Sequence, residues 1–456
     1  MTGQLVDDLL MPSEPSDCDV LIIGGGLAGL AAAGELARRD LKVRLLESRG
    51  RLGGRASSFV DHESGDMIDN CQHVAMGCCT AFLEFCRQFN MLDQFQRERE
   101  LTFLAPSCPP YRFAAGWFPA PLHLSGAFLG LPYLALSEKW QFAMGVRTLW
   151  RSSPAALRGR SFGDWLREHG QSDRIIRRIW EVLLVSALSE SMDRIDAAYA
   201  RQVLVQGFLE SRDGWEVYVP QRPLDELLTQ FVLPGLQQLG VDVQFSTGVA
   251  ELQGSGDALT AAKLNSGSAI TASSYVLAVP WHRVQSMLSE QVFEALRLPN
   301  LNQIASAPIT SVHLWVDRPL MSQRHVVLVD RLCQWLFEHP CHKPGQGMHR
   351  YQVVISASRM LSGWGREETI RQVWSELQQA FPQAAHALLS HARVVTEHRA
   401  VFSPLPGIDA LRPSQQTSIP NLQLAGDWTQ TGWPATMESA VRSGLQAARN
   451  ILKERG

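Results

Sequence analysis

A glycine-rich turn between a strand and a helix constrains the fold of this chain more than any other feature. The apolar run Asp19–Ile23 predicts a buried strand, and Gly24-Gly25-Gly26-Leu27-Ala28-Gly29 follows it directly. A helix-forming run comes next, and then a second predicted strand over 42–46 that ends on Glu47. Glu47 is placed to accept hydrogen bonds from ribose hydroxyls. Strand, glycine turn, helix, strand and acid in this order are typical of a dinucleotide-binding βαβ unit.

Three glycines of the turn have distinct structural roles in this prediction. Gly24 permits a tight turn, Gly26 lets the backbone approach a pyrophosphate, and Gly29 packs the helix close to the strand. Leu27 and Ala28, between the last two of these glycines, are also expected to bind the cofactor. Free N–H groups at the start of the helix face the phosphates, with a partial positive charge. A flexible loop would explain the glycines alone, but not the whole unit.

A second glycine pair follows the acid. Arg51-Leu52-Gly53-Gly54-Arg55 ends in a cation that can meet the same pyrophosphate, and an exposed polar turn is the alternative for this segment. A Gly-Gly-Arg after the second strand resembles the flavin amine oxidase and carotenoid desaturase superfamily. The resemblance implies that the dinucleotide is FAD, and that Gly53, Gly54 and Arg55 contact it.

The far end of the chain resembles the same superfamily. The segment 421–427 reads as a short buried strand that ends in Gly426-Asp427, and a helix is predicted after it. The resemblance implies that Asp427 lies near the ribityl chain and phosphate of FAD. It also implies that the start of the helix, at Thr436 and Met437, points at the flavin ring. A helix dipole there favours negative charge on the reduced flavin.

Composition excludes several classes of protein. The net charge of −3 gives no electrostatic case for binding nucleic acid. The eight cysteines form no Cys-x-x-Cys pair, so neither a disulfide framework nor a metal site is predicted, and a reducing compartment fits. The N-terminal residues lack the basic start and apolar core of a signal peptide. A cytoplasmic enzyme is therefore expected.

The predicted fold is α/β, with a Rossmann-type FAD-binding domain and an interleaved α+β substrate domain of the amine-oxidase-like kind. An N-terminal tail spans 1–17, the FAD-binding domain spans 18–105, 214–300 and 405–456, and the substrate domain spans 106–213 and 301–404. The resemblance implies that Val249 meets the adenine of FAD. A second glycine fingerprint is not found. Electrons are therefore expected from a transient donor, either NAD(P)H or a reductase.

The segment expected to face the flavin resembles a particular branch of the superfamily. Asp69-Asn70-Cys71-Gln72-His73-Val74 is similar to the Asp-Asn-Gly-Gln-His-Val of hydroxysqualene dehydroxylases, the squalene-associated FAD-dependent desaturases. The tail 426–444 and the segment 118–124 resemble that family as well. Cys71 departs from the pattern, because the family has glycine there. A side chain at this position can crowd the flavin or alter the turn.

The resemblance implies the reduction of hydroxysqualene, an isoprenoid lipid, to squalene in squalene and hopanoid biosynthesis. Loss of the allylic hydroxyl leaves a delocalised cation, and reduced FAD is a suitable hydride donor. An acid must protonate the leaving hydroxyl. His73 is the first candidate, since histidine titrates near neutrality, although a purely structural histidine is an equal alternative. Asp69 is expected to orient or bind the cofactor, and Glu438 to lie at a helix terminus.

Two other activities stay open at this point. Ile309–Arg318 resembles the carotene desaturases as much as the dehydroxylases, so a polyene desaturase is the main alternative. Flavin amine oxidases usually carry a lysine that bonds through water to the flavin. That position falls near Ser311, and the whole chain has only five lysines. Amine oxidation is therefore the last of the three.

The longest apolar run, Pro119–Leu136, is broken by prolines and glycines and is not predicted to span a membrane. It can line an apolar tunnel, dip into one face of a bilayer, or be buried in the core. Because the implied substrate is a water-insoluble lipid, peripheral contact with the inner face of the membrane is expected.

Overall fold

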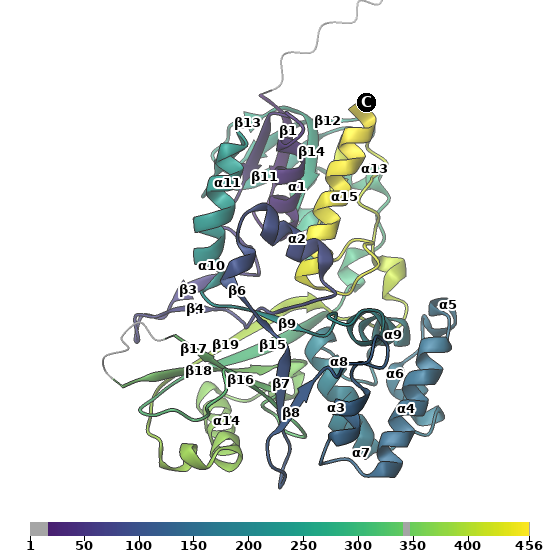
Figure 1. Cartoon of the computed structure of the whole chain (residues 1–456). Coiled ribbons are helices and arrows are strands. Elements are labelled where there is room, and N and C mark those ends of the chain that lie inside the picture. The colour runs from purple at the N-terminus through teal and green to yellow at the C-terminus, as the bar shows by residue number, and fades with distance from the viewer. Residues whose placement is uncertain (1–16, 341–346, 456) are drawn as a thin grey trace, which may run out of the picture.

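The computed structural model describes residues 17–340 and 347–455, and the predicted tail 1–17 lies outside this part of the chain except for its last residue. Figure 1 shows a body with a parallel sheet at the end that carries the C-terminus, and a second body with a larger sheet and most of the short helices. The predicted α/β fold with a parallel sheet is confirmed.

The first sheet has five parallel strands in the order β10-β2-β1-β14-β20. Their bounds are β1 (Cys18–Ile23), β2 (Val43–Leu46), β10 (Asp242–Gln244), β14 (Ala272–Leu277) and β20 (Leu422–Leu424). Val20, Leu21 and Ile22 of the central strand are completely buried. An apolar run buried on both faces is what a parallel sheet covered by helices requires. Strands from three distant parts of the chain thus form one sheet.

Helices α1 (Leu27–Ala37), α11 (Leu233–Gln238) and α15 (Met437–Arg455) pack on this sheet. Figure 1 shows α1 and α15 side by side. A Cβ atom on Gly444 of α15 would lie 2.0 Å from the carbonyl oxygen of Ala28 on α1. The absence of a side chain at Gly444 therefore permits the close crossing of the first and last helices of the cofactor side.

The second sheet has seven strands in the order β19-β15-β18-β17-β16-β7-β8. Their bounds are β7 (Glu100–Leu104), β8 (Tyr111–Ala114), β15 (Ser306–Val316), β16 (His325–Leu328), β17 (Trp335–His339), β18 (His349–Ile355) and β19 (Leu389–Phe402). Side chains of β15 alternate between two faces. Val312 and Leu314 pack in the core with α14 (Arg366–Ala380), whereas His313 and Trp315 bond to the segment 66–69.

The predicted boundary at residue 105 needs a correction. Strand β7 pairs in parallel with β16, so residues 100–104 belong to the second sheet and not to the cofactor side. Three small antiparallel sheets contain the other strands of the described residues. They contain β11 (Val249–Gly254), β12 (Leu259–Leu264) and β13 (Ala269–Ile270); β3 (Ser58–Val60) and β4 (Met67–Asp69); and β5 (Ala75–Met76), β6 (Phe95–Glu98) and β9 (Val217–Pro220).

A cluster of helices lies beside the second sheet, as the sequence predicts for the stretch that ends near residue 213. It contains α3 (Ser125–Gly130), α4 (Leu136–Arg151), α5 (Pro154–Leu157), α6 (Phe162–Glu168), α7 (Asp173–Ile175), α8 (Glu181–Leu188) and α9 (Ala197–Leu204). Trp180 is completely buried at its centre, with its ring 4.6 Å from that of Phe142 and 5.4 Å from that of Phe162. In the described residues, no helix has both the length and the apolar character needed to cross a bilayer.

Candidate cofactor site and active site

The three glycines of the first turn are required for different physical reasons. Gly24 has a φ of +113°, and a Cβ there would lie 2.4 Å from the carbonyl oxygen of Ala278. A Cβ on Gly29 would lie 2.0 Å from the carbonyl oxygen of Gly24. Gly26 has an ordinary φ of −76°, and the nearest atom to its Cβ would be 4.0 Å away. Nothing in the protein itself demands glycine at Gly26, so its side of the turn has room for a ligand.

The second glycine pair lies against the first turn. The Gly53 N–H donates to the carbonyl oxygen of Gly25 at 2.9 Å, and both Gly53 and Gly54 have positive φ. Arg55 then forms an ion pair with Asp427 and donates to the carbonyl oxygen of Ala400 at 2.9 Å. Arg55 and Asp427, both assigned to the cofactor from the sequence, are therefore partners of each other, although 372 positions separate them.

Glu47 is buried directly after β2. Its Oε2 accepts from the Gly25 N–H and its Oε1 from the Arg49 N–H, both at 2.8 Å, and the Ser48 hydroxyl donates to Oε1 at 3.2 Å. A carboxylate has about four acceptor sites. The chain thus fixes the orientation of Glu47 and leaves it capacity for one further donor, such as a ribose hydroxyl.

The loop between β20 and α15 is held by buried hydrogen bonds. The Gly426 N–H donates to Ser443 Oγ at 2.8 Å. Arg412, which is almost completely buried, donates to the carbonyl oxygens of Asp427 at 3.1 Å and Thr429 at 2.5 Å. These bonds place the loop, and with it the start of α15, against the first glycine turn.

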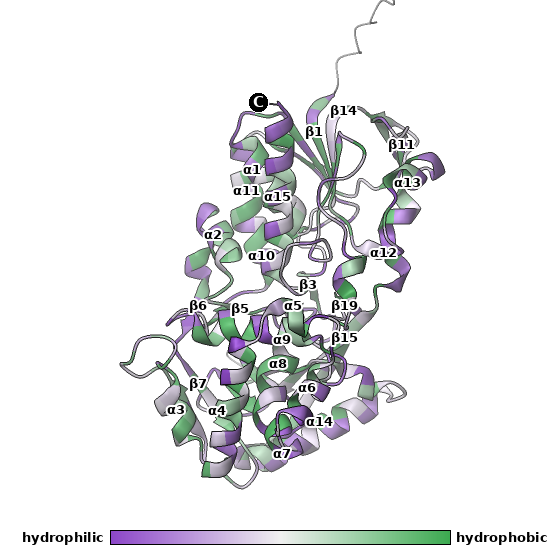
Figure 2. Ribbon diagram, turned by 90° about the vertical axis from the view of Figure 1, so that its right-hand side faces the viewer, coloured by the Kyte–Doolittle hydropathy of each residue, from purple (hydrophilic) through white to green (hydrophobic). Residues whose placement is uncertain are grey.

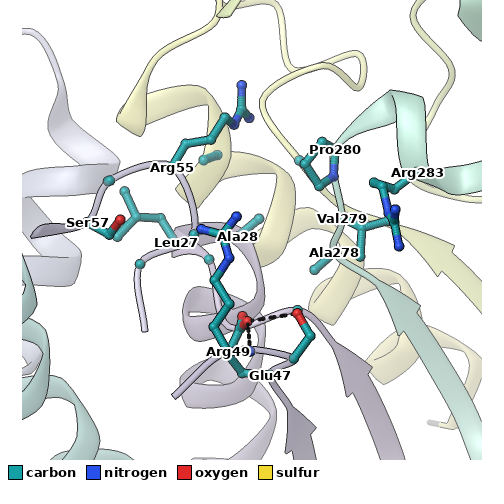
Figure 3. Close-up of a pocket in the computed structure, with 18 of the residues that line it drawn as sticks. Leu27, Ala28, Glu47, Arg49, Arg55, Ser57, Ala278, Val279, Pro280 and Arg283 are labelled. Atoms are coloured by element: carbon teal, nitrogen blue, oxygen red, sulfur yellow. Dashed lines mark hydrogen bonds between the residues drawn. The ribbon is translucent and has the colours of Figure 1, made fainter. Parts of the chain in front are cut away.

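All of these segments surround one cavity of about 770 Å³. Of the predicted site residues, those that line it are Gly24, Gly26, Leu27, Ala28, Glu47, Gly53, Gly54, Arg55, His73, Val249, Gly426, Asp427, Thr436 and Met437. Gly29 does not line the cavity, because it packs against Gly24. Figure 3 shows Glu47 and Arg49 at one end, and Val279, Pro280 and Arg283 on the opposite wall.

Sequence reasoning missed part of this cavity. The polar residues it did not identify include Arg49, Ser57, Asn70, Thr247, Asn265, His282, Arg283, Glu397 and Arg399. Only Asn70 lies in a segment that had been singled out. The rest come from loops, from α12 (Trp281–Val284) and from β19, where no local pattern indicates a ligand. In total, five arginines and three carboxylates line the cavity, a positive balance that suits a pyrophosphate.

The environment of His73 does not favour the predicted role of general acid. The ring lines the cavity, but its Nδ1 is buried and has no hydrogen-bond partner in the described residues. Burial lowers the pKa of His73 to about 4, and a hydrogen bond with the backbone of Cys71 offsets this only in part. At neutral pH the ring is therefore uncharged, and its spare nitrogen is available to a ligand in the cavity.

Cys71 does not crowd the cavity. Its side chain is buried against Phe337 and Val354 of the second sheet, and Trp335 packs on the same cluster. The backbone of Cys71 has no positive φ, so a side chain is tolerated in this turn. The rings of Trp335 and Phe337 stack at 5.5 Å. An apolar wall thus stands beside the segment that carries His73.

Two carboxylates have structural contacts. Asp69 accepts from Ser58 Oγ at 2.5 Å and from the Leu224 N–H at 3.0 Å, and burial raises its pKa to about 6. It does not line the cavity, so it orients the chain around it. Glu438 lies in the first turn of α15, as predicted, and accepts from the N–H groups of Ala81 and Phe82, which begin α2 (Thr80–Gln88).

Ser311 occupies the position where an amine oxidase is expected to carry lysine. It is buried on β15, and its hydroxyl accepts from Gln352 Nε2 at 2.6 Å. No lysine is found among the residues that line the cavity. Of the five lysines, Lys343 lies outside the described residues. Among the described residues, the cavity therefore lacks the lysine that an amine oxidase is expected to carry.

Comparison with known proteins agrees with this site. Residues 27–452 match the family of flavin containing amine oxidoreductases. Hydroxysqualene dehydroxylase of Rhodopseudomonas palustris is 28% identical over 95% of this chain and 98% of its own length. The chloroplastic/chromoplastic 15-cis-phytoene desaturase of an Oncidium hybrid cultivar is 27% identical over 98% of this chain and 79% of its own. The 15-cis-phytoene desaturase of Synechococcus elongatus is 25% identical over 95% of both.

Solved structures share the fold. Putrescine oxidase superposes with a TM-score of 0.70 at 15% identity, over 96% of this chain and 99% of that one. Cyclohexylamine oxidase from Brevibacterium oxydans superposes with a TM-score of 0.66 at 19% identity, over 97% of this chain and all of that one. At such identities the likeness concerns the fold alone. It confirms the predicted arrangement of a parallel sheet with a second, mixed body.

Proposed function

The chain belongs to the family of flavin containing amine oxidoreductases and is an FAD-dependent oxidoreductase, and from this premise we propose that it reduces hydroxysqualene to squalene. The observation that carries the proposal is the end-to-end match with the hydroxysqualene dehydroxylase of R. palustris. The segment 69–74 and the tail 426–444 support it, because they resemble that family in the parts of the chain that surround the cavity.

The residues of the cavity fit FAD. Gly26 leaves a space that a Cβ would fill, and Glu47 keeps one acceptor site after its contacts with the chain. We assign the pyrophosphate to the first turn and the start of α1, with Glu47 on a ribose and Val249 near the adenine. Thr436 and Met437, at the start of α15, are assigned to the flavin end. A helix N-terminus there stabilises negative charge.

The proposed reaction replaces a C–O bond by a C–H bond. Hydroxysqualene takes up one hydride and one proton, and squalene and water leave, so atoms and electrons balance. FAD, when bound and reduced, supplies the hydride. The protein orients the allylic carbon and keeps water away from it. We assign the exclusion of water to the apolar wall formed by Cys71, Trp335 and Phe337.

The same wall favours a hydrocarbon over an amine. The pKa of His73 near 4 keeps the ring uncharged, and the wall itself contributes only apolar side chains. An ammonium substrate would lose its hydration there without gaining a partner, which is costly. We therefore propose an isoprenoid chain as the substrate. Electrons are proposed to come from a transient donor, either NAD(P)H or a reductase.

Product analysis tests the proposal. Purified protein with bound FAD is reduced without oxygen, given hydroxysqualene, and the lipid products are identified by mass spectrometry. We expect squalene, with one deuterium at the former carbinol carbon when the reaction is run in D2O, because the N5–H of reduced flavin exchanges with solvent. Recovery of unchanged hydroxysqualene, from protein whose flavin is shown to be reduced, contradicts the proposal.

A polyene desaturase is the second candidate, and the matches with 15-cis-phytoene desaturases favour it. In that case the oxidised enzyme would remove hydrogen from a long polyene and the flavin would end reduced. Oxidised protein is therefore incubated with phytoene or squalene in a parallel reaction. New double bonds in the product would assign the chain to the desaturases.

A further inference from the structure

Large apolar side chains are exposed along one continuous segment beside the second sheet. Trp117 is 81% exposed, Leu136 80% and Trp140 66%, and Phe118, Leu122 and Leu129 are also exposed. We call these six residues the 117–140 patch. Soluble proteins seldom expose contiguous apolar surface unless another surface covers it. The apolar run predicted from the sequence is thus neither fully buried nor a spanning helix.

The patch is a folded unit with defined contacts. The Gly116 N–H donates to the carbonyl oxygen of His123 at 2.7 Å, which closes the loop before α3. Lys139 Nζ donates to the carbonyl oxygen of Leu129 at 2.6 Å, and the rings of Phe128 and Phe142 pack at 4.9 Å. These contacts hold α3 beside the first turns of α4. Figure 2 shows the two helices together at the end of the molecule opposite to β1 and β14.

Helix α4 continues the patch along its outer side. Its inner side buries Phe142, Gly145 and Leu149. The exposed positions are Leu136, Ser137, Trp140, Ala143, Arg147, Trp150 and Arg151. Their recurrence after three or four residues places them on one side of the helix. Tryptophan, leucine and arginine on the outward side are typical of a helix that lies in a membrane interface.

Basic residues outnumber acids along the patch and α4. Between residues 115 and 152 the sequence has three lysines and arginines and a single acid, in a chain whose net charge is −3. That acid, Glu138, is buried and paired with Arg174. Arg147 and Arg151 are exposed, and neither has an ion pair with any residue that the structure describes. Basic residues beside exposed tryptophans complement the anionic headgroups of a bilayer.

We propose that the 117–140 patch and the outer side of α4 dock this protein on an anionic lipid bilayer. The inference concerns the surface and does not depend on the proposed reaction, although a bilayer is where a water-insoluble isoprenoid resides. A second copy of the chain is disfavoured as the partner, because a two-fold interface would bring the same arginines together. The bilayer supplies the opposite charge and an apolar layer at once.

Vesicle flotation with the full-length, FAD-loaded protein tests this proposal. The vesicles contain phosphatidylcholine alone or with about one third phosphatidylglycerol. We expect binding to the anionic vesicles, weakened by salt. Replacement of Trp117, Leu136 and Trp140 by serine should reduce the bound fraction about tenfold or more, because three anchors leave the interface. Arg147→Glu with Arg151→Glu should abolish only the preference for anionic lipid.

A matched control replaces three exposed apolar residues elsewhere, Met360, Trp364 and Leu388, by serine. This variant should float like the wild type. FAD content and far-UV circular dichroism show that each variant is folded. Absence of binding by the wild type, or equal binding by the patch and control variants, would overturn the proposal. A different result would be a wild type that binds no vesicles and forms a dimer that becomes monomeric when the patch is substituted. That result would overturn the proposal and assign the patch to contact with a second copy.

Discussion

The five-stranded and seven-stranded sheets approach the cofactor cavity from opposite bodies, and they contribute different kinds of contact. The parallel sheet brings backbone: glycines 24, 26, 53 and 54 and the start of α1, where the cavity meets main-chain atoms. The other sheet brings side chains, such as Glu397 and Arg399 of β19, which line the cavity. A backbone cradle tolerates almost no substitution, whereas a wall of side chains can be changed to suit another substrate.

The largest effects are expected from substitutions in the glycine turn, where Gly29 is needed for packing and Gly26 for binding FAD. Gly29→Ala places a Cβ 2.0 Å from a backbone oxygen, and it should lower the free energy of unfolding by about 3 kcal/mol or more. Gly26→Ala has no such contact, and its stability without FAD should stay within about 0.5 kcal/mol of the wild type. Gly26→Ala should nevertheless lose FAD. Thermal unfolding of the apoproteins and flavin absorbance measure the two effects, and equal stability of both variants contradicts the assignment.

Substitution of Glu47 should have a smaller effect on both the free energy of unfolding and the binding of FAD. Glu47→Ala leaves the Gly25 and Arg49 N–H groups without their acceptor, which costs about 1 to 3 kcal/mol. It also removes the proposed ribose contact, so the Kd for FAD should rise about tenfold or more. Fluorescence of released FAD measures this affinity. Ser48→Ala removes only a neighbouring hydroxyl and serves as the control. Unchanged affinity in Glu47→Ala would remove Glu47 from the site.

His73 lies between the two sheets, and its protonation should make the free energy of unfolding depend on pH. The unfolded chain binds a proton at His73 with a pKa of 6.5, whereas the folded chain does so only at about 4. The unfolded state therefore holds more protons between these values, and stability falls as the pH drops from 6.5 towards 4.

Replacement of His73 by glutamine should remove about 3 kcal/mol of this pH dependence, as measured by Tm across the range. The same change at the exposed His62 is the control. An identical pH profile in wild type and His73→Gln would mean that the ring is not held neutral. If His73→Gln also retains turnover, the general-acid role predicted from the sequence is excluded.

The smallest effect is expected on the side-chain wall. Cys71→Ala removes one sulfur from contact with Phe337 and Val354, and should cost about 1 kcal/mol without changing the FAD content. Cys18→Ala, in the buried β1, is a matched control on the parallel sheet. Only the Cys71 variant should change KM for the lipid substrate. Loss of FAD from Cys71→Ala would show that the wall also belongs to the cofactor site.

Local constraints explain why the sequence determined the cofactor turn. A positive φ at Gly24 and the close packing of Gly29 on Gly24 act over a few residues, so they leave a readable pattern. The same holds for Gly426-Asp427 before α15. Only the tertiary structure decided that Arg55 pairs with Asp427, that Cys71 turns away from the cavity, and that burial lowers the pKa of His73. Pairing, exposure and desolvation depend on which distant segments pack together, and that information lies in the strand order rather than in any single segment.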